Sequence, residues 1–454
     1  MSINHLYRQI TMKETILLLL FSFNAYSLTF SVNSVSDTLD IIPGDGTCLD
    51  SFGQCSLRAA IMESNALSGA DTVYLQRSTT YELALVAGAN DESFGDLDIT
   101  DSLTLSIINP GTAAQSADEL PVIDANGIGR VISVNSFPEV TILGIVIVGG
   151  DASSELVNEG GGIYVGSVIK FNLLNSIVFG NKAAQGAGIQ TYAVENLISF
   201  SDFSFNSILE SNTLSPRGAA INNEGGDTTI QYSSIHNNGM DFESAFCYGA
   251  VRNSNTTADM YIFNSTIALN GTSASTNCIS GLRAFDSNLS LVNTTVYKNS
   301  GWGLQIQGSN GDTDVFVRNS IVANNEINNC LFNGVISSNN FGDANGGNNI
   351  ASDISCSLPN ISGNIENTDP KLDEGHALFP GLVPTFIYYE PLPGSPAIDA
   401  GSPLAVNIGN PNACQQYDQI LRIRPIDSDG NGSAVCDIGA IENNNDLIFK
   451  SGFE

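Results

Sequence analysis

Basic side chains are scarce in this sequence. Its 454 residues include 16 lysines and arginines against 47 aspartates and glutamates, which gives a formal net charge of −31 at pH 7. A strongly acidic surface repels polyanions. The composition therefore excludes DNA, RNA and anionic lipid headgroups as partners over most of the molecule.

Histidine is scarcer still, because the chain holds only His5, His236 and His376. The sequence also lacks a nucleophile elbow, a histidine cluster with metal-ligand spacing and a phosphate-binding loop. These absences argue against serine–histidine or zinc-dependent hydrolysis.

Long apolar runs occur only near the start of the chain. The stretch MKETILLLLFSFNAYS, from Met12, has a basic residue, an apolar run at 16–23 and small residues at cleavage-site spacing. This pattern predicts a secretory signal peptide over residues 1–27, with Met12 as the true start, because about eight apolar residues are too few to span a bilayer. We expect an exported protein without a membrane span, located outside the cell or on the outer surface of a Gram-negative bacterium.

Helical periodicity is confined to one segment. In CSLRAAIMESNA, residues 55–66, Leu57, Ala60 and Ile61 fall at helix spacing. Elsewhere the chain repeats a strand motif, as in FNLLNSIVFGN and VFVRNSIVANN. Aligned on Asn175, the equivalent positions follow at steps of 26 to 32 residues and are Gly144, Ser201, Ser233, Asn264, Asn293 and Asn319.

Each repeat contains at least two short strands. Apolar residues alternate before the aligned position, and a second strand opened by small residues precedes it, as in GGGIYV and GAGIQTY. Stacked units of this period predict an all-β, right-handed parallel β-helix of the pectate-lyase type. The helix at 55–66 would cover the open end of its core.

The repeats divide the chain into five expected segments. They are the signal peptide at 1–27, an N-terminal cap at 28–69, the parallel β-helix at 70–370, a C-terminal cap at 371–442 and a tail at 443–454. The tail LIFKSGFE is a sorting signal read by a receptor, a frayed end or a last strand.

The cysteines test the repeat alignment. Cys247 lies four residues before Val251, and Cys278 lies four residues before Leu282, so successive coils place the two sulfurs within disulfide distance. An exported chain favours disulfides, and the other expected pairs are Cys330–Cys356, Cys48–Cys55 and Cys414–Cys436.

Both ends of the chain resemble known modules. CSLRAAIMESNALSGADTVYL, GDLDITDSLTLS and PVIDANGIGRVISV resemble the N-terminal module of exported bacterial β-helix proteins named for their CSLREA sequence. Ala59 replaces the Glu of that motif, so Ser56 lacks the partner for a reciprocal capping box, and we expect a weaker helix start.

LPGSPAIDAGSP, DQILRIRP and CDIGAIE resemble the C-terminal choice-of-anchor Q module, with the DQRG turn changed to DQIL at 418–421. The stretches GGI at 161–163 and FSFN at 203–206 are similar to repeats of polymorphic outer-membrane adhesins. These resemblances imply an architecture and leave the activity open.

Two further motifs have alternative interpretations. Asp427, Asp429 and Asn431, in DSDGNG, resemble the first half of an EF-hand loop and favour Ca²⁺, although Ile438 stands where the twelfth-position Glu belongs. An ordinary Asx-rich turn explains them equally well. His236 has apolar equivalents in the repeat, so we expect a half-buried, hydrogen-bonded histidine there; the equivalents are Val178, Ile267 and Val296.

The clearest candidate surface is the outer face of the second strand. Side chains alternate between the two faces of a strand, so the residues after the core positions form one exposed column: Tyr164, Gln190, Asn222, Arg252, Arg283 and Gln305. A parallel column contains Gly166, Tyr192, Glu224, Ser254, Phe285 and Gln307. Within them, rings for stacking and charged groups for uronates suit a glycan, with Tyr192, Glu224, Arg252, Arg283 and Phe285 as the binding residues.

An ordinary solvated sheet face remains the alternative, and two functions fit the candidate surface. The protein is either an adhesive or glycan-binding rod without catalysis, whose partner is an extracellular glycan or a host or neighbouring cell surface, or a polysaccharide lyase or glycoside hydrolase. In a lyase, Arg252 or Arg283 would act on a uronate beside Glu224. Hydrolysis needs paired carboxylates, and the projected face offers only Glu224, so the sequence favours binding, with no organic cofactor.

Overall fold

The computed structural model describes residues 27–444 except for 86–94, 111–116, 137, 213, 243, 245, 247, 256–257, 272–277, 310–312, 335–337, 342–346, 361–362, 380–384, 408–409 and 411. Nearly all of the expected signal peptide and most of the expected tail therefore lie outside the described residues.

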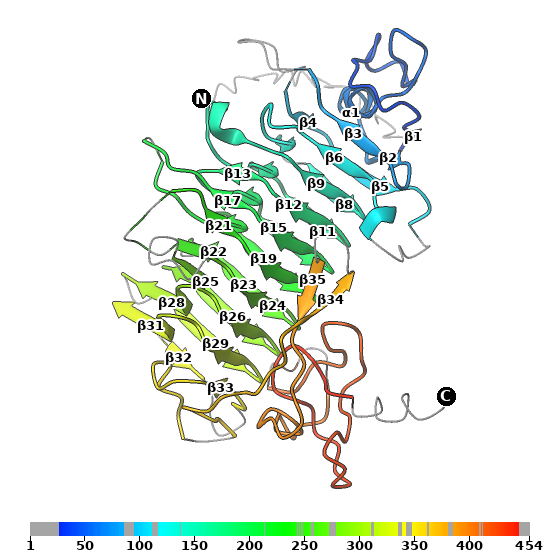
Figure 1. Ribbon diagram of the computed structural model, residues 1–454. Helices are drawn as coiled ribbons and strands as arrows, with labels where there is room; N and C mark the ends of the chain where they lie inside the picture. Colours follow the sequence, from blue (N-terminus) through cyan, green and yellow to red (C-terminus); the bar gives the residue numbers. More distant parts are fainter. Residues whose placement is uncertain are drawn as a thin grey trace, which may run out of the picture.

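Three long parallel sheets wind around one apolar core and form the predicted right-handed parallel β-helix (Figure 1). A typical coil runs through one strand of each sheet in the order sheet 1, sheet 2, sheet 3, as β10, β11 and β12 do. Each strand pairs in parallel with its equivalent in the next coil, so the repeat has three strands.

Sheet 1 consists, in spatial order, of β4 (Leu97–Ile99), β7 (Ile132–Val134), β10 (Ile163–Val165), β14 (Ile189–Thr191), β18 (Ile221–Asn223), β22 (Tyr248–Asn253), β25 (Ile279–Phe285), β28 (Trp302–Gly308) and β31 (Asn328–Gly334). Sheet 2 consists of β1 (Thr29–Ser31), β2 (Asp71–Leu75), β5 (Leu103–Ile107), β8 (Glu139–Leu143), β11 (Lys170–Leu174), β15 (Glu195–Ser199), β19 (Asp227–Gln231), β23 (Asp259–Phe263), β26 (Asn288–Val292), β29 (Asp314–Arg318) and β32 (Ser338–Asn340).

Sheet 3 consists of β3 (Thr80–Glu82), β6 (Val122–Asp124), β9 (Val146–Val148), β12 (Ile177–Phe179), β16 (Asp202–Ser204), β20 (Ser234–His236), β24 (Thr266–Ala268), β27 (Thr295–Tyr297), β30 (Ile321–Ala323) and β33 (Ile350–Ala351). A short parallel sheet adds β13 (Lys182–Ala183), β17 (Ser207–Ile208) and β21 (Gly239–Met240), and an antiparallel hairpin adds β34 (His376–Phe379) and β35 (Thr385–Tyr388). The helical elements are α1 (Leu57–Ala66) and the 3₁₀ turns η1 (Ala117–Glu119) and η2 (Ala152–Ser154).

The corner between sheets 2 and 3 requires a left-handed backbone, which Asn and Gly adopt most readily. Asn175 has a φ of +49° there, and the register places Phe200 and Tyr232 at the same position, with φ of +51° and +49°. The expectation of Ser201 and Ser233 was therefore wrong by one residue. The two aromatic rings stack on each other, with centroids 4.7 Å apart and planes within 6°, which supports a conformation that bulky residues rarely adopt.

The same one-residue shift changes the position of His236 in the repeat from the predicted one. It pairs with Ser204 and Ala268, whereas Ile235 takes the position that we expected for it. The expectation of a half-buried histidine was also wrong, because His236 is fully buried.

A ladder of buried asparagines links the coils. The side-chain amide of Asn206 donates to Asn238 Oδ1 at 3.0 Å, that of Asn238 donates to Asn270 Oδ1 at 3.0 Å, and Asn181, Asn299 and Asn325 continue the series. The strands of sheet 1 begin with small residues because the asparagine ladder leaves no room for a larger side chain there. A Cβ at Gly303, for example, would lie 2.6 Å from Asn325 Nδ2. The glycine motif and the asparagine motif of the repeat therefore pack against each other.

The helix at the N-terminal end forms as predicted. Ser56 is the N-cap of α1 and accepts a hydrogen bond from the Ala59 N–H. Arg58 is buried against Asp37, with Nε and Oδ1 2.6 Å apart, and donates to the backbone oxygens of Gly95 and Asp96. These contacts hold α1 against the first coils.

The C-terminal segment folds back along the outside of the helix (Figure 1). The hairpin β34–β35 lies against β16 and β20, and Gln419 donates from Nε2 to the backbone oxygen of Ser233. Asp418 accepts hydrogen bonds from the backbone N–H groups of Ile420, Arg422 and Glu442. Leu421, where the DQRG turn would place Gly, keeps a left-handed φ of +68°.

Three of the four expected disulfides are present: Cys48–Cys55, Cys330–Cys356 and Cys414–Cys436. Cys278 is also in a disulfide, but Cys247, its expected partner, lies outside the described residues, so that pair stays a prediction. The register supports the pairing, because Val251 pairs with Leu282.

Candidate functional site

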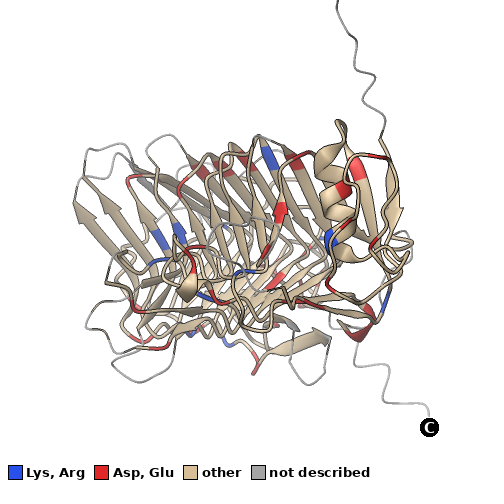
Figure 2. Cartoon of the chain, turned by 90° about the horizontal axis from the view of Figure 1, so that it is seen from above, with Lys and Arg blue, Asp and Glu red and all other residues tan. Residues whose placement is uncertain are grey.

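The outer face of sheet 1 carries the predicted columns in the predicted register. The core positions before the first column are all buried, and its members Tyr164, Gln190, Asn222, Arg252, Arg283 and Gln305 occupy paired positions in successive strands. The few basic segments of the chain stand out among the many acidic ones in Figure 2.

The middle of this face is not exposed, which corrects the expectation. Gln190 and Asn222 are fully buried and Arg252 is 6% exposed. The cause is the turn that leads into each strand of sheet 1: a Cβ at Gly218 would lie only 2.6 Å from the Cβ of Asn222, so the turn packs directly on the column. Asn222 donates to Gln190 Oε1 at 2.7 Å and accepts from Arg252 Nη1 at 3.0 Å.

Glu224 is the centre of a charged cluster. Its Oε1 lies 2.7 Å from Arg252 Nη1 and also accepts a hydrogen bond from Arg217. Burial disfavours its charge, but the hydrogen bonds and charges of the two arginines outweigh burial and lower the pKa of Glu224. Burial, and then the charge of Arg217, lowers the pKa of Arg252 to about 10.

Arg217 was missed in the sequence, although a signal for it was present. It lies four residues before Ile221, just as Glu159 and Gln185 lie four residues before their own core positions. Bridges pair Glu159 with Gln185 and Gln185 with Arg217. The offset that placed the two cysteines therefore also defines a third column at the edge of this face.

Glu159 and Tyr192 form a second charged group one coil away. The Tyr192 hydroxyl donates to Glu159 Oε2 at 3.0 Å. Burial, reinforced by the charge of Glu224, raises the pKa of Glu159. Burial also raises the pKa of Tyr192, as do the nearby carboxylates of Glu159 and Glu224. The face thus holds two carboxyl groups with oppositely shifted pKa values.

Arg283 differs from its neighbours because it has no hydrogen-bond or ion-pair partner among the described residues, and its Nε is buried without an acceptor. Burial, followed by the charge of Arg217, lowers its pKa. Phe285, two residues further along the same strand, is half-buried and pairs with Gln307. The predicted residues therefore lie in two parts on either side of the Glu224 cluster: Arg283 with Phe285, and Tyr192, whose partner Glu159 was not predicted.

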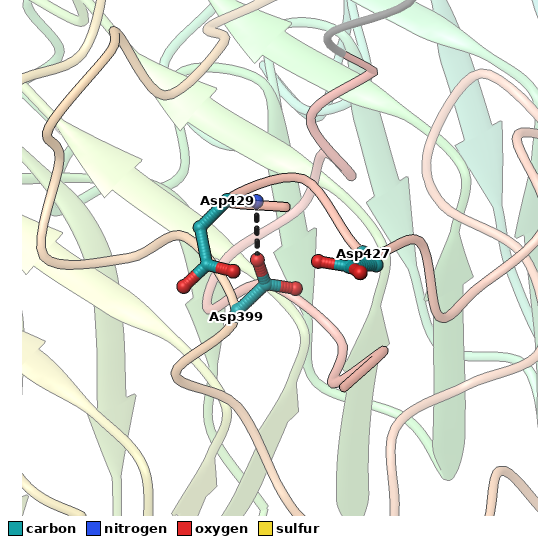
Figure 3. Close-up of side chains that lie close together, drawn as sticks. All are labelled: Asp399, Asp427 and Asp429. Carbon is teal, nitrogen blue, oxygen red and sulfur yellow. Dashed lines mark hydrogen bonds between the residues drawn. The ribbon is translucent and has the colours of Figure 1, made fainter. Parts of the chain in front are cut away.

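The predicted calcium residues lie in a separate turn. Asp399, Asp427 and Asp429 each place one carboxylate oxygen within 4.8 Å of the others (Figure 3). Asp399 was missed in the sequence, and Asn431 instead donates to Asp429 within the turn at 2.7 Å. Three carboxylates form a suitable oxygen donor set for Ca²⁺, and burial, with the Asp429 charge, raises the pKa of Asp399.

Calcium binding there stays a prediction. We expect Ca²⁺ to raise the apparent melting temperature of the protein, because a bound ion at about 100 times its dissociation constant stabilises the folded state by roughly 2.7 kcal/mol. Differential scanning calorimetry with Ca²⁺ and with Mg²⁺ would measure this shift. Asp399→Asn should abolish it, and an equal Ca²⁺ shift in wild type and variant would rule this site out.

No family model and no curated protein matches the chain. Among solved structures it is similar to pectate lyase Pel9A, with a TM-score of 0.47 and 12% identity over 93% of this chain and 98% of that one. It is also similar to the periplasmic alginate epimerase AlgG, with a TM-score of 0.31 and 10% identity over 59% of this chain and 74% of that one. At these identities the likeness concerns the fold alone. The CSLREA and choice-of-anchor Q assignments stay predictions.

The disulfides are the observation that bears on location. Such bonds form and persist in oxidising compartments, which fits an exported protein. Among the described residues, no helix has the length and apolar character to cross a membrane.

Proposed function

We propose that the protein binds an acidic polysaccharide on the outer face of sheet 1, as an exported, adhesive or glycan-binding rod. The observation that carries this proposal is Arg283, a guanidinium group that has no hydrogen-bond or ion-pair partner in the described part of the chain and lies beside two further arginines on a chain of net charge −31. A uronate carboxylate would accept hydrogen bonds from Arg283 and relieve its repulsion with Arg217. The ring of Phe285 lies on the same strand and offers a face for a sugar.

Arg252 has a different role in this proposal. Its hydrogen bonds to Asn222 and Glu224 hold the centre of the face together, so it is a positioning residue. A double replacement of Arg252 and Arg283 would therefore mix a folding defect with a binding defect. Arg283 alone gives the cleaner test.

We expect Arg283→Ser to weaken binding of acidic oligosaccharides at least tenfold, since a hydrogen bond to a charged group contributes about 1.5–3 kcal/mol. The folded state should be unaffected or slightly more stable, because Arg283 makes no hydrogen bond to any residue that the structure describes and a repulsion is removed. Binding would be measured on an array of uronate-containing glycans at low and high salt.

Lys298→Ser is the matched control, since it removes one positive charge from an exposed side chain after β27 in sheet 3. Arg283→Lys should retain part of the affinity. Equal affinity and equal salt dependence in Arg283→Ser and wild type would refute the proposal.

A second candidate function is glycoside hydrolysis, favoured by the oppositely shifted pKa values of Glu159 and Glu224. A raised pKa suits a general acid that protonates the leaving oxygen, and a lowered pKa suits a carboxylate that acts as base or nucleophile. Release of reducing ends, lost in Glu159→Gln, would establish it. Ultraviolet absorption from unsaturated uronates would instead indicate a lyase using the arginines.

A further inference from the structure

A cleft lies on the outer face of sheet 2, away from the arginines of sheet 1. It has a volume of about 540 Å³ and is formed by β19, β23, β26 and β29. Gln415, from the C-terminal segment, closes one side. The backbone N–H of Gln415 donates to Asn293 Oδ1 at 3.1 Å, and this hydrogen bond fixes the C-terminal side of the cleft to the β-helix. The C-terminal segment therefore forms part of the wall of this cleft.

Three side chains from successive coils line the cleft, and the small middle one lies between two aromatic ones. The register pairs Tyr261 with Ser290 and Ser290 with Phe316, and all three face outward and are half-buried. Two strand spacings place the aromatic residues roughly 10 Å apart. Because stacked rings lie about 4.5–7 Å apart, the gap over Ser290 has room for one flat ring between them.

The aromatic side chains of the cleft are held in place by their neighbours. The rings of Tyr261 and Phe263 are parallel within 8°, with centroids 6.3 Å apart. The Tyr261 hydroxyl donates to Asp259 Oδ2 at 2.8 Å, and the pKa of Tyr261 is raised to about 12 by burial and by that carboxylate. On the other side, the guanidinium of Arg318 packs over Phe316 at 4.2 Å. Both walls are held before any ligand arrives.

The rim of the cleft is polar and acidic. Asp259, Asn288 and Asp314 occupy equivalent positions in successive coils, and the side-chain amide of Asn288 donates to Asp259 Oδ1 at 2.8 Å. Carboxylate and amide groups accept hydrogen bonds from hydroxyl groups. The two aspartates repel an anionic ligand, so the cleft differs in charge from the face of sheet 1.

We propose that this cleft binds an uncharged sugar ring of an oligosaccharide. The C–H faces of such a ring would pack between Tyr261 and Phe316 above Ser290, and its hydroxyl groups would donate to Asp259 and Asn288 at the rim. Because this site lies on another sheet and selects against the charge that Arg283 would recognise, the proposal does not depend on the function proposed above.

Ser290→Phe is the sharpest test, since it fills the gap between Tyr261 and Phe316 without removing an aromatic wall. The probes are linear glucan, mannan and xylan oligosaccharides, with binding measured by isothermal titration calorimetry up to millimolar concentrations. We expect wild type to bind at least one of these series. Ser290→Phe and Tyr261→Ala should each weaken that binding at least tenfold.

Leu197→Phe is the matched control, because it adds a ring to the same outward column two coils before Tyr261 and outside the cleft. Circular dichroism and melting curves would establish that each variant is folded, and Ser290→Ala provides a milder change that should retain binding. Binding in Arg283→Ser should equal wild type. The proposal is overturned if no neutral series binds, or if Ser290→Phe binds as wild type does.

Discussion

Replacing Asp202 by alanine is expected to destabilise the folded protein by about 3–5 kcal/mol, as removal of one partner from a buried ion pair does, and to loosen the docked C-terminal hairpin. Asp202 and His236 are both fully buried, with Oδ1 and Nε2 3.0 Å apart. The same carboxylate accepts hydrogen bonds from the hydroxyl groups of Ser204 and Ser234. It also accepts one from the backbone N–H of Phe386 at 2.8 Å, which ties β35 to sheet 3.

The measurement is urea unfolding combined with limited proteolysis of the hairpin. Ser204→Ala is the matched control, because it removes only one of these hydrogen bonds and should cost about 1 kcal/mol. If the hairpin of Asp202→Ala resists protease as well as wild type does, the ion pair does not hold it in place.

The pair also gives the stability of the folded state a pH dependence with a definite sign. Burial opposes both charges, yet their mutual attraction and hydrogen bond raise the pKa of His236 and lower that of Asp202. The His236 contribution is complete below its ordinary pKa of about 6.5 and is lost as the pH rises through the folded-state value. The Asp202 contribution is complete above about pH 4 and is lost as the pH falls through the folded-state value.

The contribution of this pair to the free energy of unfolding should therefore be largest between about pH 4 and 6.5 and fall on either side. Urea unfolding at a series of pH values would show the profile. Asp202→Ala should flatten it, because both titrations depend on the pair.

The sequence predicted the register of the helix because strand alternation and repeat offset are local properties. The pairing of Arg252 with Arg283 and of Tyr164 with Gln190 followed from these two rules alone. Exposure did not follow, because burial of Gln190 and Asn222 depends on a turn that packs back over its own strand. The four-residue offset that placed the cysteines would also have identified Arg217, but the prediction used it for the cysteines alone.

Other features depend on contacts between distant parts of the chain. Phe386 reaches Asp202 across 184 residues, and Gln415 reaches Asn293 across 122. No periodicity in either segment indicates such contacts, so neither the ion pair under the hairpin nor the cleft on sheet 2 could be predicted. Phe200 and Tyr232 were misplaced for a related reason: a stacked partner in the next coil supports a backbone conformation that their own chemistry disfavours.

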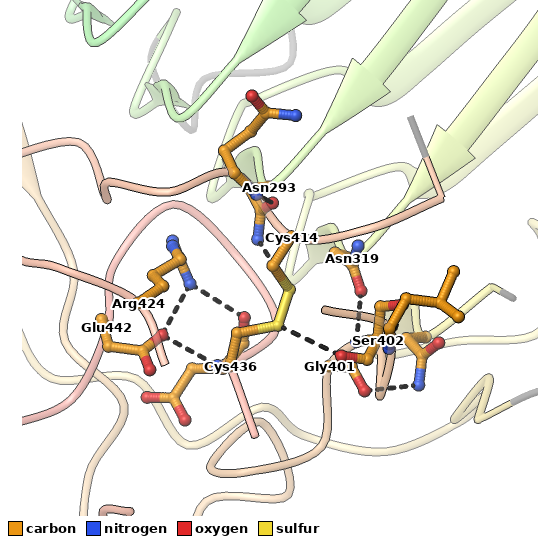
Figure 4. The surroundings of a disulfide bond; sticks show 12 residues. Asn293, Asn319, Gly401, Ser402, Cys414, Arg424, Cys436 and Glu442 are labelled. Atoms are coloured by element: carbon orange, nitrogen blue, oxygen red, sulfur yellow. Dashed lines mark hydrogen bonds and ion pairs between the residues drawn. A yellow bond between two sulfur atoms is a disulfide. The ribbon is translucent and has the colours of Figure 1, made fainter. Parts of the chain in front are cut away.

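The second large effect is expected at Arg424, where the C-terminal segment meets the helix (Figure 4). Its side chain is fully buried, with Nη1 2.8 Å from Glu442 Oε2 and Nη2 donating to the backbone oxygen of Gly439 at 2.9 Å. Gly439 lies on sheet 3, because its N–H donates to the backbone oxygen of Asn319 and a Cβ there would lie 2.8 Å from Ile321 Cδ1. Arg424 thus holds the turn through which the segment docks.

Arg424→Met should therefore destabilise the C-terminal segment by about 3–5 kcal/mol, because it leaves buried carboxyl groups without their cation. Burial, and then the charge of Glu442, already raises the pKa of Asp437 to about 8, although the charge of Arg424 acts in the opposite direction. Loss of the Arg424 charge would therefore disfavour the ionised form of Asp437 further. Unfolding in urea, followed by protease cleavage at the segment, would measure the loss.

The double variant Arg424→Met, Glu442→Gln separates charge from packing. Glu442 now accepts from the backbone N–H of Asp437 with Oε2 and from that of Ile426 with Oε1, so the single oxygen of glutamine can keep only one of these two hydrogen bonds. If the uncompensated charge dominates, the double variant should recover part of the stability that the single variant loses. A double variant no more stable than Arg424→Met would instead assign the effect to the lost guanidinium hydrogen bonds, above all the one that holds Gly439 against sheet 3.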